Sequence, residues 1–253
     1  MRGLTGKTAI VTGGGSGIGR AISLRLAKEG CNGGVLDVNE AGARETVAQM
    51  PKDAGLALKC DITDYDAVAQ SVKAVEDRFG GVDILVNNVG WDKALPFLES
   101  DFTFWKKVVD INLYGALNMH YAVLPIMLKR NYGKVVNIAS DAGRVGSSGE
   151  AVYSACKGGV IAFTKTMARE LSRSNIRLNT VCPGPTDTPL FESFIGTDGL
   201  GPKIREGLKR SIPLRRLGEP DDYPGIVAFL ASEDANFITG QTISVSGGLT
   251  MHG

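Results

Sequence analysis

Hydrophobic positions along this chain fall into short apolar runs that alternate with longer segments of helical periodicity. Several runs are apolar at consecutive positions, as are strands that a parallel sheet buries on both faces. The intervening segments repeat apolar residues every three or four positions, which predicts amphipathic helices. Predicted strands cover residues 8–11, 35–38, 56–59, 84–86, 134–138, 177–181 and 242–245, and predicted helices cover 18–29, 41–49, 65–79, 102–129, 151–172 and 221–231.

This alternation of strand and helix, with short connections, predicts an α/β fold built on a doubly wound parallel sheet of the Rossmann type. No linker or internal repeat divides the chain, so residues 1–253 are predicted to form a single domain. The long proline- and glycine-rich connection from Pro183 to Pro220 stands out. Such connections inside compact domains are usually functional, and we predict a substrate lid at about 185–215. The alternative is an irregular surface excursion.

A glycine-rich turn joins the first predicted strand to the first predicted helix. Glycines allow a tight turn and close approach of a pyrophosphate, and the helix N-terminus offers free N–H groups and a positive dipole end. The spacing departs from the general G-x-G-x-x-G fingerprint, but the position directly after the first strand supports a dinucleotide site. The predicted contacts from this turn are Gly13, Ser16, Gly17, Ile18 and Gly19.

An acidic residue, Asp37, closes the second predicted strand, 20 residues after Gly17. A carboxylate at this place can accept hydrogen bonds from both adenosine ribose hydroxyls and would repel the 2′-phosphate of NADP. The sequence therefore predicts NAD as the cofactor, against the alternative that Asp37 only caps the strand. Asp61, after the third strand, is predicted to meet the adenine or, alternatively, to cap the next helix. Further predicted cofactor contacts are Ile62, Asn88 and Gly90.

The strongest chemical signal is the pair Tyr153 and Lys157, which lie four residues apart on one face of a predicted helix. A tyrosine titrates near pH 10, too high for a base at neutral pH, and a nearby ammonium can lower that pKa. Ser140 ends the preceding strand and can hold a carbonyl or alkoxide oxygen. The alternative for the Tyr/Lys pair alone is a solvated helix face. Together with the glycine turn and Asp37, the pair predicts acid/base chemistry on an alcohol or ketone.

These residues carry a resemblance that covers the chain from residue 7 to about 249. The matching stretches are TGGGSGIG at 12–19, NNVG at 87–90, Asn112 within INLYG, Ser140, YSACK at 153–157 and PGPTDT at 183–188. In this combination the chain resembles the short-chain dehydrogenase/reductase family. The resemblance implies a seven-stranded sheet in the order 3-2-1-4-5-6-7, and a homotetramer in which the helices containing Asn112 and Tyr153 form an interface.

The resemblance also implies individual roles. Tyr153 would give or take the hydroxyl proton, Lys157 would also hold the nicotinamide ribose, and Ser140 would orient the substrate oxygen. Asn112 would hold a water that relays protons from Lys157, and Thr188 would contact the nicotinamide carboxamide. Tyr153 and Lys157 thus count as cofactor contacts as well, together with Pro183, Gly184 and Thr186.

Several loop stretches are similar to one subgroup, the 2-hydroxycyclohexanecarboxyl-CoA dehydrogenases. This similarity implies oxidation of that thioester, or of a related hydroxyacyl-CoA or cyclic alcohol. Trp91 would wall the ring, Arg144 would meet an anionic or thioester group, and Glu150 would be a further substrate contact. Basic lid residues would meet CoA phosphates or, alternatively, form a solvated helix face; these are Lys203, Arg205, Lys209 and Arg210.

Three other functions stay open. One is a 3-oxoacyl-[acyl-carrier-protein] reductase, a group that normally prefers NADPH, which Asp37 argues against. Another is a dehydrogenase of free aryl or cyclic secondary alcohols. The third, a non-catalytic NAD-binding scaffold, is disfavoured because Tyr153 and Lys157 are both present.

Charge and composition exclude several other classes of protein. Lys plus Arg number 28 and Asp plus Glu 27, so the net charge of +1 favours neither nucleic acid nor an anionic membrane as a partner. No apolar run is long enough to span a bilayer, and the N-terminus lacks a secretory pattern, so a cytoplasmic location is expected. The four cysteines form no C-x-x-C pair and there are only two histidines, so no metal site is predicted.

Overall fold

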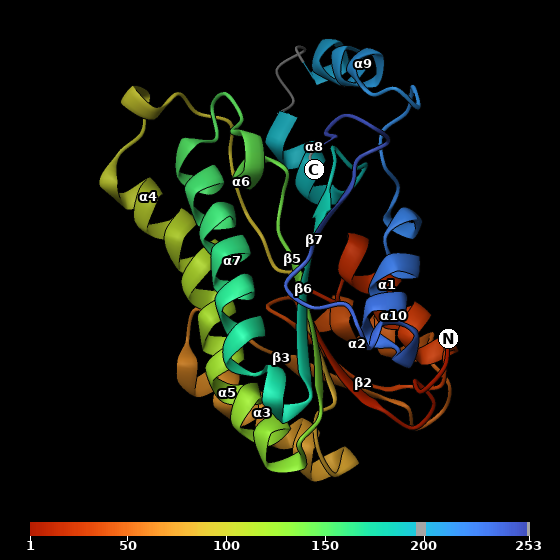
Figure 1. The fold of residues 1–253 in the computed structure, drawn as a ribbon. Helices are drawn as coiled ribbons and strands as arrows, with labels where there is room; N and C mark the ends of the chain where they lie inside the picture. The colour runs from red at the N-terminus through yellow and green to blue at the C-terminus, as the bar shows by residue number, and fades with distance from the viewer. Residues whose placement is uncertain (196–200, 252–253) are drawn as a thin grey trace.

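Within residues 1–195 and 201–251, which the computed structural model describes, seven parallel strands form one sheet in the order β3-β2-β1-β4-β5-β6-β7 (Figure 1). This arrangement confirms the predicted fold and its strand order. The strands are β1 Thr8–Thr12, β2 Asn32–Asp37, β3 Gly55–Lys59, β4 Ile84–Asn87, β5 Gly133–Ile138, β6 Ile176–Pro183 and β7 Thr242–Val245.

Helices cover both faces of the sheet (Figure 1). On one face, apolar residues of α3, α5 and α7 pack against the strands around Ile10 and Leu85. On the other face, α1 and α10 pack around Val11 and Val86. The helices are α1 Gly17–Lys28, α2 Glu40–Ala48, α3 Tyr65–Phe79, α4 Phe102–Val109, α5 Gly115–Arg130, α6 Ala142–Val145, α7 Ala151–Glu170, α8 Pro189–Ile195, α9 Gly201–Ser211 and α10 Pro224–Ala231.

Strand β2 begins earlier than the hydrophobic pattern predicts, because two glycines belong to it. A Cβ at Gly33 would lie 2.7 Å from the Cε atom of Met50, and one at Gly34 would lie 2.5 Å from a methyl carbon of Val75. The missing side chains therefore let Met50, just after α2, and Val75 of α3 approach the sheet closely. Glycine lowers the apparent β-propensity of the segment, so the first part of the strand was not predicted.

The single helix predicted over 102–129 is interrupted by a π-helical turn, Asp110–Tyr114. Asn112 lies in this turn, and its side-chain amide donates to the carbonyl oxygens of Trp91 (2.6 Å) and Val108 (2.9 Å). Its Oδ1 atom accepts from the backbone N–H of Trp91 at 3.1 Å. Single π-helical turns inside helices occur frequently at functional sites, and this one fixes the chain that follows β4.

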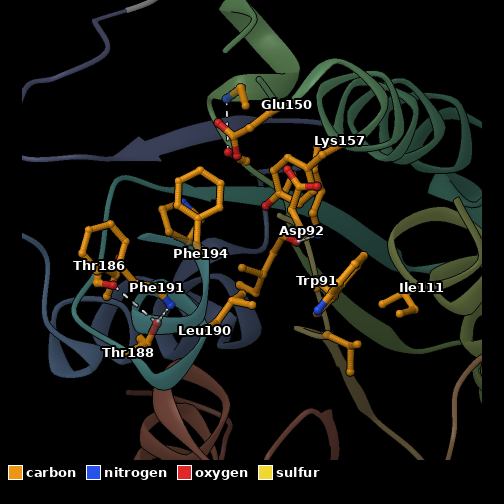
Figure 2. Close-up of a pocket in the computed structure, with 18 of the residues that line it drawn as sticks. Trp91, Asp92, Ile111, Glu150, Lys157, Thr186, Thr188, Leu190, Phe191 and Phe194 are labelled. Atoms are coloured by element: carbon orange, nitrogen blue, oxygen red, sulfur yellow. Dashed lines mark hydrogen bonds between the residues drawn. The ribbon is translucent and has the colours of Figure 1, made fainter. Parts of the chain in front are cut away.

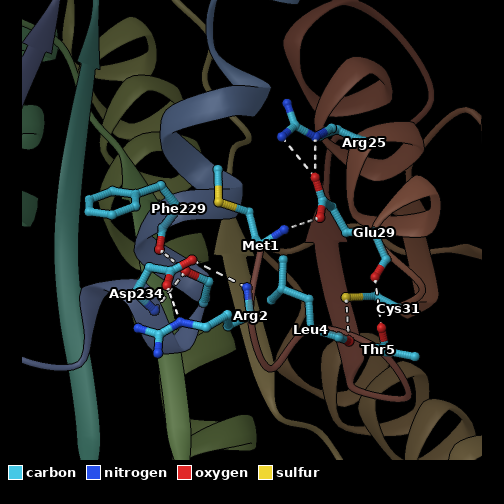
Figure 3. Close-up of polar contacts among 10 residues, drawn as sticks. Met1, Arg2, Leu4, Thr5, Arg25, Glu29, Cys31, Phe229 and Asp234 are labelled. Atoms are coloured by element: carbon cyan, nitrogen blue, oxygen red, sulfur yellow. Dashed lines mark hydrogen bonds and ion pairs between the residues drawn. The ribbon is translucent and has the colours of Figure 1, made fainter.

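The N-terminal segment is held by side chains from both ends of the sequence (Figure 3). The Met1 amino group lies 2.6 Å from a carboxylate oxygen of Glu29, and the Arg2 guanidinium donates to Asp234 at 2.5 Å. The thiol of Cys31 donates to the Leu4 carbonyl at 3.2 Å. These contacts fasten the chain that enters β1. Over the described part of the chain, none of the helices combines the length and apolarity that a membrane crossing requires.

Candidate active site

A cavity of about 1310 Å³ opens at the carboxyl ends of the strands (Figure 2). Its walls come from the turns that follow β1, β2, β3, β4, β5 and β6, and from the lid helices α8 and α9. Ligands of open α/β sheets bind at this edge, because the loops at the carboxyl ends converge there. The cavity is large enough for a dinucleotide and a substrate together.

The glycine turn forms one end of this cavity, and its geometry fits a pyrophosphate. Gly13 and Gly17 have φ angles of 64° and 50°, a backbone conformation that favours glycine. Ser16 precedes α1 without capping it through its side chain, so the first N–H groups of that helix stay available to an anion. A Cβ at Gly19 would lie 2.1 Å from the Gly13 carbonyl oxygen. Gly19 does not line the cavity; it allows the turn to pack on the helix.

The Asp37 carboxylate lies where the adenosine ribose is expected. Its oxygens accept hydrogen bonds from the backbone N–H groups of Gly15 (2.9 Å) and Asn39 (2.9 Å). Asp37 and the exposed Val38 both line the cavity. The basic side chains among the described lining residues are Lys106, Lys107 and Lys157, which belong to α4 and α7 rather than to the end of β2. An acidic wall at the end of β2 is the arrangement that suits an unphosphorylated ribose.

The other sequence-predicted cofactor residues also line the cavity. Some of them have structural partners too: Asp61 accepts from the N–H and hydroxyl of Thr63 (2.9 and 2.8 Å), while Asp64 is the residue that caps α3. Thr188 Oγ1 accepts from the Phe191 N–H at 3.2 Å, in the first turn of α8. The lining residues among the predicted set are Gly13, Ser16, Gly17, Ile18, Asp37, Asp61, Ile62, Asn88, Gly90, Tyr153, Lys157, Pro183, Gly184, Thr186 and Thr188.

Lys157 is buried at the base of the site. Its ammonium donates to the Ile138 carbonyl at 3.2 Å and lies 5.5 Å from the centre of the Tyr153 ring. Burial lowers the pKa of Lys157 to about 8. A Cβ on Gly90 would lie 3.3 Å from both this ammonium nitrogen and the Asn112 Oδ1 atom. Glycine at position 90 therefore lets Lys157 and Asn112 approach each other.

The environment of Tyr153 differs from the expectation that Lys157 lowers its pKa. Burial raises the pKa of the Tyr153 phenol, the charges of Glu150 and Asp92 raise it further, and a hydrogen bond with Ser140 opposes the rise. The expectation considered only the helix spacing of Tyr153 and Lys157, which says nothing about the two carboxyls or about burial. In the cofactor-free protein, the phenol is therefore held in its protonated form.

Asn112 lines a small cavity beside the large one, of about 10 Å³, together with Lys157. That volume is about the smallest that holds one water. The Asn112 amide is already bound to Trp91 and Val108, so the side chain is fixed rather than free to turn.

The predicted substrate residues separate into two groups. Trp91 and Glu150 line the large cavity, and the Trp91 ring is packed between Phe104 (5.9 Å between centres) and the Lys107 ammonium (3.8 Å). Arg144 is not among the lining residues. Its guanidinium donates to Ser244 at 2.7 Å and lies 3.8 Å from the Asp141 carboxylate. The sequence could place Arg144 near Ser140 but not the direction of its side chain.

The predicted lid consists of α8 and α9, and its residues 196–200 lie outside the described part of the chain. Apolar side chains of both helices face the cavity, and Figure 2 shows three of them. The Arg205 guanidinium is bound by Asp187 (2.9 Å) and by Glu192, and Lys209 is bound by Glu206 (3.1 Å). These two cations are paired with lid carboxylates, and their expected contact with CoA phosphates stays a prediction. The apolar lid residues that line the cavity are Leu190, Phe191, Phe194, Ile204 and Leu208.

One acidic residue of the site, Asp92, was missed at the sequence level. It follows Trp91 directly, is only 7% exposed and lines the cavity. The sequence shows Asp92 directly after NNVGW. A polar residue in a predicted loop is ordinarily exposed to solvent, so Asp92 was not selected as a site residue. No group of three or more His, Cys, Asp or Glu side chains suited to a metal ion occurs among residues 1–195 and 201–251.

Comparison with sequences of known proteins gives one consistent group of relatives. A family model described as enoyl-(acyl carrier protein) reductase matches residues 13–250. The 3-oxoacyl-[acyl-carrier-protein] reductase FabG of Staphylococcus epidermidis is 41% identical over 251 residues, covering 97% of this chain and 99% of the relative. The corresponding reductase of Thermotoga maritima is 37% identical over 254 residues, covering 98% of this chain and 99% of the relative.

Solved structures agree with these relatives. A 3-ketoacyl-(acyl-carrier-protein) reductase from Brucella melitensis, complexed with NADH, superposes with a TM-score of 0.90 at 32% identity, covering 98% of this chain and all of that one. Levodione reductase superposes with a TM-score of 0.93 at 34% identity, covering 96% of this chain and 97% of that one.

Proposed function

The chain belongs to the short-chain dehydrogenase/reductase family, and we propose that it is an NAD(H)-linked oxidoreductase that interconverts a 3-oxoacyl thioester and the corresponding 3-hydroxyacyl thioester. One observation carries the proposal. Ser140, Tyr153 and Lys157 come together on a single cavity, whose other end is the uncapped N-terminus of α1.

The choice of substrate class rests on the relatives. Both curated reductases and the Brucella structure are named for 3-oxoacyl or 3-ketoacyl substrates carried on acyl carrier protein. These names favour the reductase alternative over the 2-hydroxycyclohexanecarboxyl-CoA dehydrogenase that the loop similarity implied. The ion pairs of Arg205 and Lys209 within the lid remove one argument for a CoA site.

The side chains divide the work of the reaction. Bound nicotinamide would supply the hydride for ketone reduction or accept it from the alcohol. Ser140 would donate a hydrogen bond to the ketone oxygen, and the Tyr153 phenol would give that oxygen its proton. Lys157 would place its positive charge below the phenol, which stabilises the phenolate left behind. Asn112 would hold a water beside Lys157, through which a replacement proton arrives.

The proposed preference for NAD(H) is supported by Asp37. Its carboxylate occupies the ribose end of the cavity, and that end carries no basic residue among those that line it. A 2′-phosphate there would face an uncompensated negative charge. The NADH bound to the Brucella structure shows that a related reductase takes this cofactor. Asp37 and the NADH-bound relative both argue against NADPH, the cofactor that the sequence analysis associated with 3-oxoacyl-[acyl-carrier-protein] reductases.

A second candidate substrate is a cyclic ketone, in line with the free cyclic alcohol alternative. Two observations favour it: the similarity to levodione reductase, and the aromatic side chains of Trp91, Phe191 and Phe194 on the cavity wall. Flat apolar walls suit a ring as well as an acyl chain.

The experiment that decides between the two is NADH oxidation followed at 340 nm with acetoacetyl-pantetheine, acetoacetyl-CoA and 4-methylcyclohexanone. The proposal predicts the highest kcat/KM for a thioester, and similar values for the two thioesters. A much higher kcat/KM for the cyclic ketone would overturn the thioester assignment in favour of the second candidate. No turnover of any ketone with either NADH or NADPH would overturn the proposed function altogether.

A further inference from the structure

Two carboxyl groups meet in the wall of the cavity, next to Tyr153. Asp92 follows β4 and Glu150 immediately precedes α7. A backbone hydrogen bond of 2.9 Å from the Leu95 N–H to the Gly149 carbonyl ties their two loops together. Both residues line the cavity, and Figure 2 shows them on the side that carries Lys157.

Each carboxyl is held in place by its own loop. Trp91, the residue before Asp92, is fixed through both its N–H and its carbonyl by the Asn112 side chain. Glu150 accepts a hydrogen bond from the Ser147 hydroxyl. These contacts fix the backbone next to Asp92 and the side chain of Glu150 within the site.

Asp92 has an oxygen that the protein does not satisfy. The side chain is 7% exposed, and its Oδ2 atom has no hydrogen-bond partner among the described residues. No ion pair of Asp92 or Glu150 with a cation is present within residues 1–195 and 201–251. A buried carboxylate without such a partner is costly, so a site of this kind is usually functional.

The two carboxyls share their electrostatic environment. The pKa of Asp92 is raised to about 7, mainly by burial; the charge of Glu150 and a hydrogen bond with it contribute to this rise, and a backbone hydrogen bond from Lys93 opposes it. Burial also raises the pKa of Glu150. Two carboxyls in contact share one proton up to about neutral pH, because the charge of the first ionised carboxyl raises the pKa of the second.

Other titratable groups face this pair from α7 and α4. The charge of Asp92 raises the pKa of both Tyr153 and Cys156 on α7. Among the described residues, the cations that line the cavity are Lys157, bound to the Ile138 carbonyl, Lys107, which lies over the Trp91 ring, and Lys106, which is paired with Asp110. The carboxyl pair therefore places a negative charge in the wall next to Tyr153 at neutral pH.

We propose that Asp92 and Glu150 form a specificity-determining carboxyl pair that excludes free 3-oxo carboxylates from the cavity and admits the uncharged acyl ester or thioester. This inference rests on the proposed function and adds a reason for substrate choice. A free 3-oxo acid carries its carboxylate two bonds from the ketone carbon, so it would bring a second negative charge to the pair. A thioester of the same acid carries none.

The experiment compares acetoacetate with methyl acetoacetate, which have the same 3-oxo chain and differ in charge. The wild type is expected to favour the ester in kcat/KM by on the order of tenfold or more at pH 7.5, the scale of one charge repulsion at about 10 Å in a partly buried site. The preference should lie mainly in KM, because the repulsion acts on binding. Asp92→Asn combined with Glu150→Gln should bring the ratio of kcat/KM for ester to acetoacetate close to one.

A matched control and the pH dependence separate specificity from a structural role. Glu99→Gln removes an exposed carboxyl from the same loop, outside the cavity, and should leave the wild-type ratio of kcat/KM for ester to acetoacetate unchanged. Acetoacetate stays ionised from pH 6 to 8, whereas the pair loses its shared proton over this range. The ester preference of the wild type should thus increase with pH, and that of the double variant should stay flat.

Several results would overturn the inference. The first is a wild-type ratio of kcat/KM for ester to acetoacetate near one. The second is the same preference for the ester in the double variant as in the wild type. The third is a wild-type preference for the ester that does not change with pH. If the double variant does not fold, the single variant Glu150→Gln and the wild-type pH series still decide. If neither compound is turned over, equilibrium binding of both to the NADH-bound enzyme, measured by nicotinamide fluorescence, decides instead, and the thioester assay tests the proposed function separately. Equal binding, or no binding of either, would then reject the carboxyl pair.

Discussion

At the scale of single residues, the site combines Tyr153, the proposed general acid, with surroundings that keep it protonated. Burial and the charges of Glu150 and Asp92 raise the pKa of Tyr153, while burial lowers that of Lys157 to about 8. A protonated phenol is the form that donates a proton to a ketone. The cofactor-free site is therefore set for reduction, and alcohol oxidation requires the phenol to ionise first.

Replacing Tyr153 by phenylalanine keeps the ring and removes the titrating oxygen. Turnover should fall at least about a hundredfold, the usual scale for a positioned acid/base group. The dissociation constant for NADH, measured by fluorescence, should change little. Wild-type alcohol oxidation should rise as the pH rises, because only the phenolate accepts the proton. Near-normal turnover of Tyr153→Phe would show that another group is the acid.

Replacing Asp37 by alanine tests the cofactor preference. The wild type should use NADH with a higher kcat/KM than NADPH, because the carboxylate repels the 2′-phosphate. Asp37→Ala should reduce this difference, mainly by lowering the KM for NADPH. Asp61→Ala, a carboxyl at the end of the neighbouring strand, serves as the control and should leave the preference for NADH in place. Equal efficiency of the wild type with both cofactors would contradict the preference.

At the scale of elements, the contact between α6 and α7 positions the proposed catalytic side chains, Ser140 and Tyr153, relative to each other. A Cβ at Gly143 would lie 2.5 Å from the backbone nitrogen of Gly158 and 2.6 Å from the carbonyl carbon of Lys157. The loop after β5, which carries Ser140, thus rests directly on the backbone of the helix that carries Tyr153.

Replacing Gly143 by alanine should separate α6 from α7. The overlap is with backbone atoms, so the expected loss in the free energy of unfolding is about 1–3 kcal/mol. Turnover should fall while NADH binding persists, because the Ser140 and Tyr153 hydroxyls would no longer both reach the ketone oxygen of the substrate. Gly207→Ala in α9 is the matched control, since a Cβ there meets nothing within 4 Å. Equal effects of the two substitutions on turnover would argue against this positioning contact.

At the scale of the whole molecule, large apolar side chains remain exposed on the helices that cover one face of the sheet. Tyr121 is 72% exposed on α5, and Phe102, Tyr114 and Leu128 are exposed nearby in sequence. Exposed apolar groups of this size, gathered on neighbouring helices, are typical of subunit interfaces.

We therefore expect light scattering at micromolar concentration to give a homotetramer, four copies of the 26.7 kDa chain. Tyr121→Asp should reduce the measured mass, because it would bury a charge between subunits. Leu98→Asp, at an exposed site outside these helices, should not reduce it. A wild-type monomer would contradict the prediction.

The raised pKa of Asp92 also has a consequence for the stability of the whole chain. The folded state holds the Asp92 proton up to about pH 7, whereas an unfolded aspartate releases it near pH 4. Between these values the folded state binds more protons, so the contribution of Asp92 to the free energy of unfolding falls as the pH rises. It is fully favourable below about pH 4, and its loss is complete above about pH 7.

Urea unfolding of Asp92→Asn at pH 5 and pH 8 checks this consequence. The variant should lose less stability than the wild type between the two pH values, since asparagine does not ionise. Asp221→Asn, a change at an exposed carboxyl, should behave like the wild type. If Asp92→Asn and the wild type lose the same amount, Asp92 is not a buried, protonated group in solution.

The sequence by itself determined the architecture and most residues of the candidate site. Alternating apolar and helical patterns were enough for the parallel sheet, because they record which faces are buried. Glycine spacing, Asp37 and the Tyr153–Lys157 pair act through local geometry, namely a turn, a strand end and one helix face. Such features are set by neighbours in the chain, so a single sequence reveals them.

Only the tertiary structure decided the direction and surroundings of the side chains. It turned Arg144 toward Ser244, engaged Arg205 with lid carboxylates, and brought Asp92 to Glu150 across two loops. These outcomes depend on burial and on partners far away in the chain, which no local pattern records. The same holds for the pKa of Tyr153: the helix spacing provided the neighbouring ammonium, but desolvation and two carboxyls from the folded cavity wall set its direction.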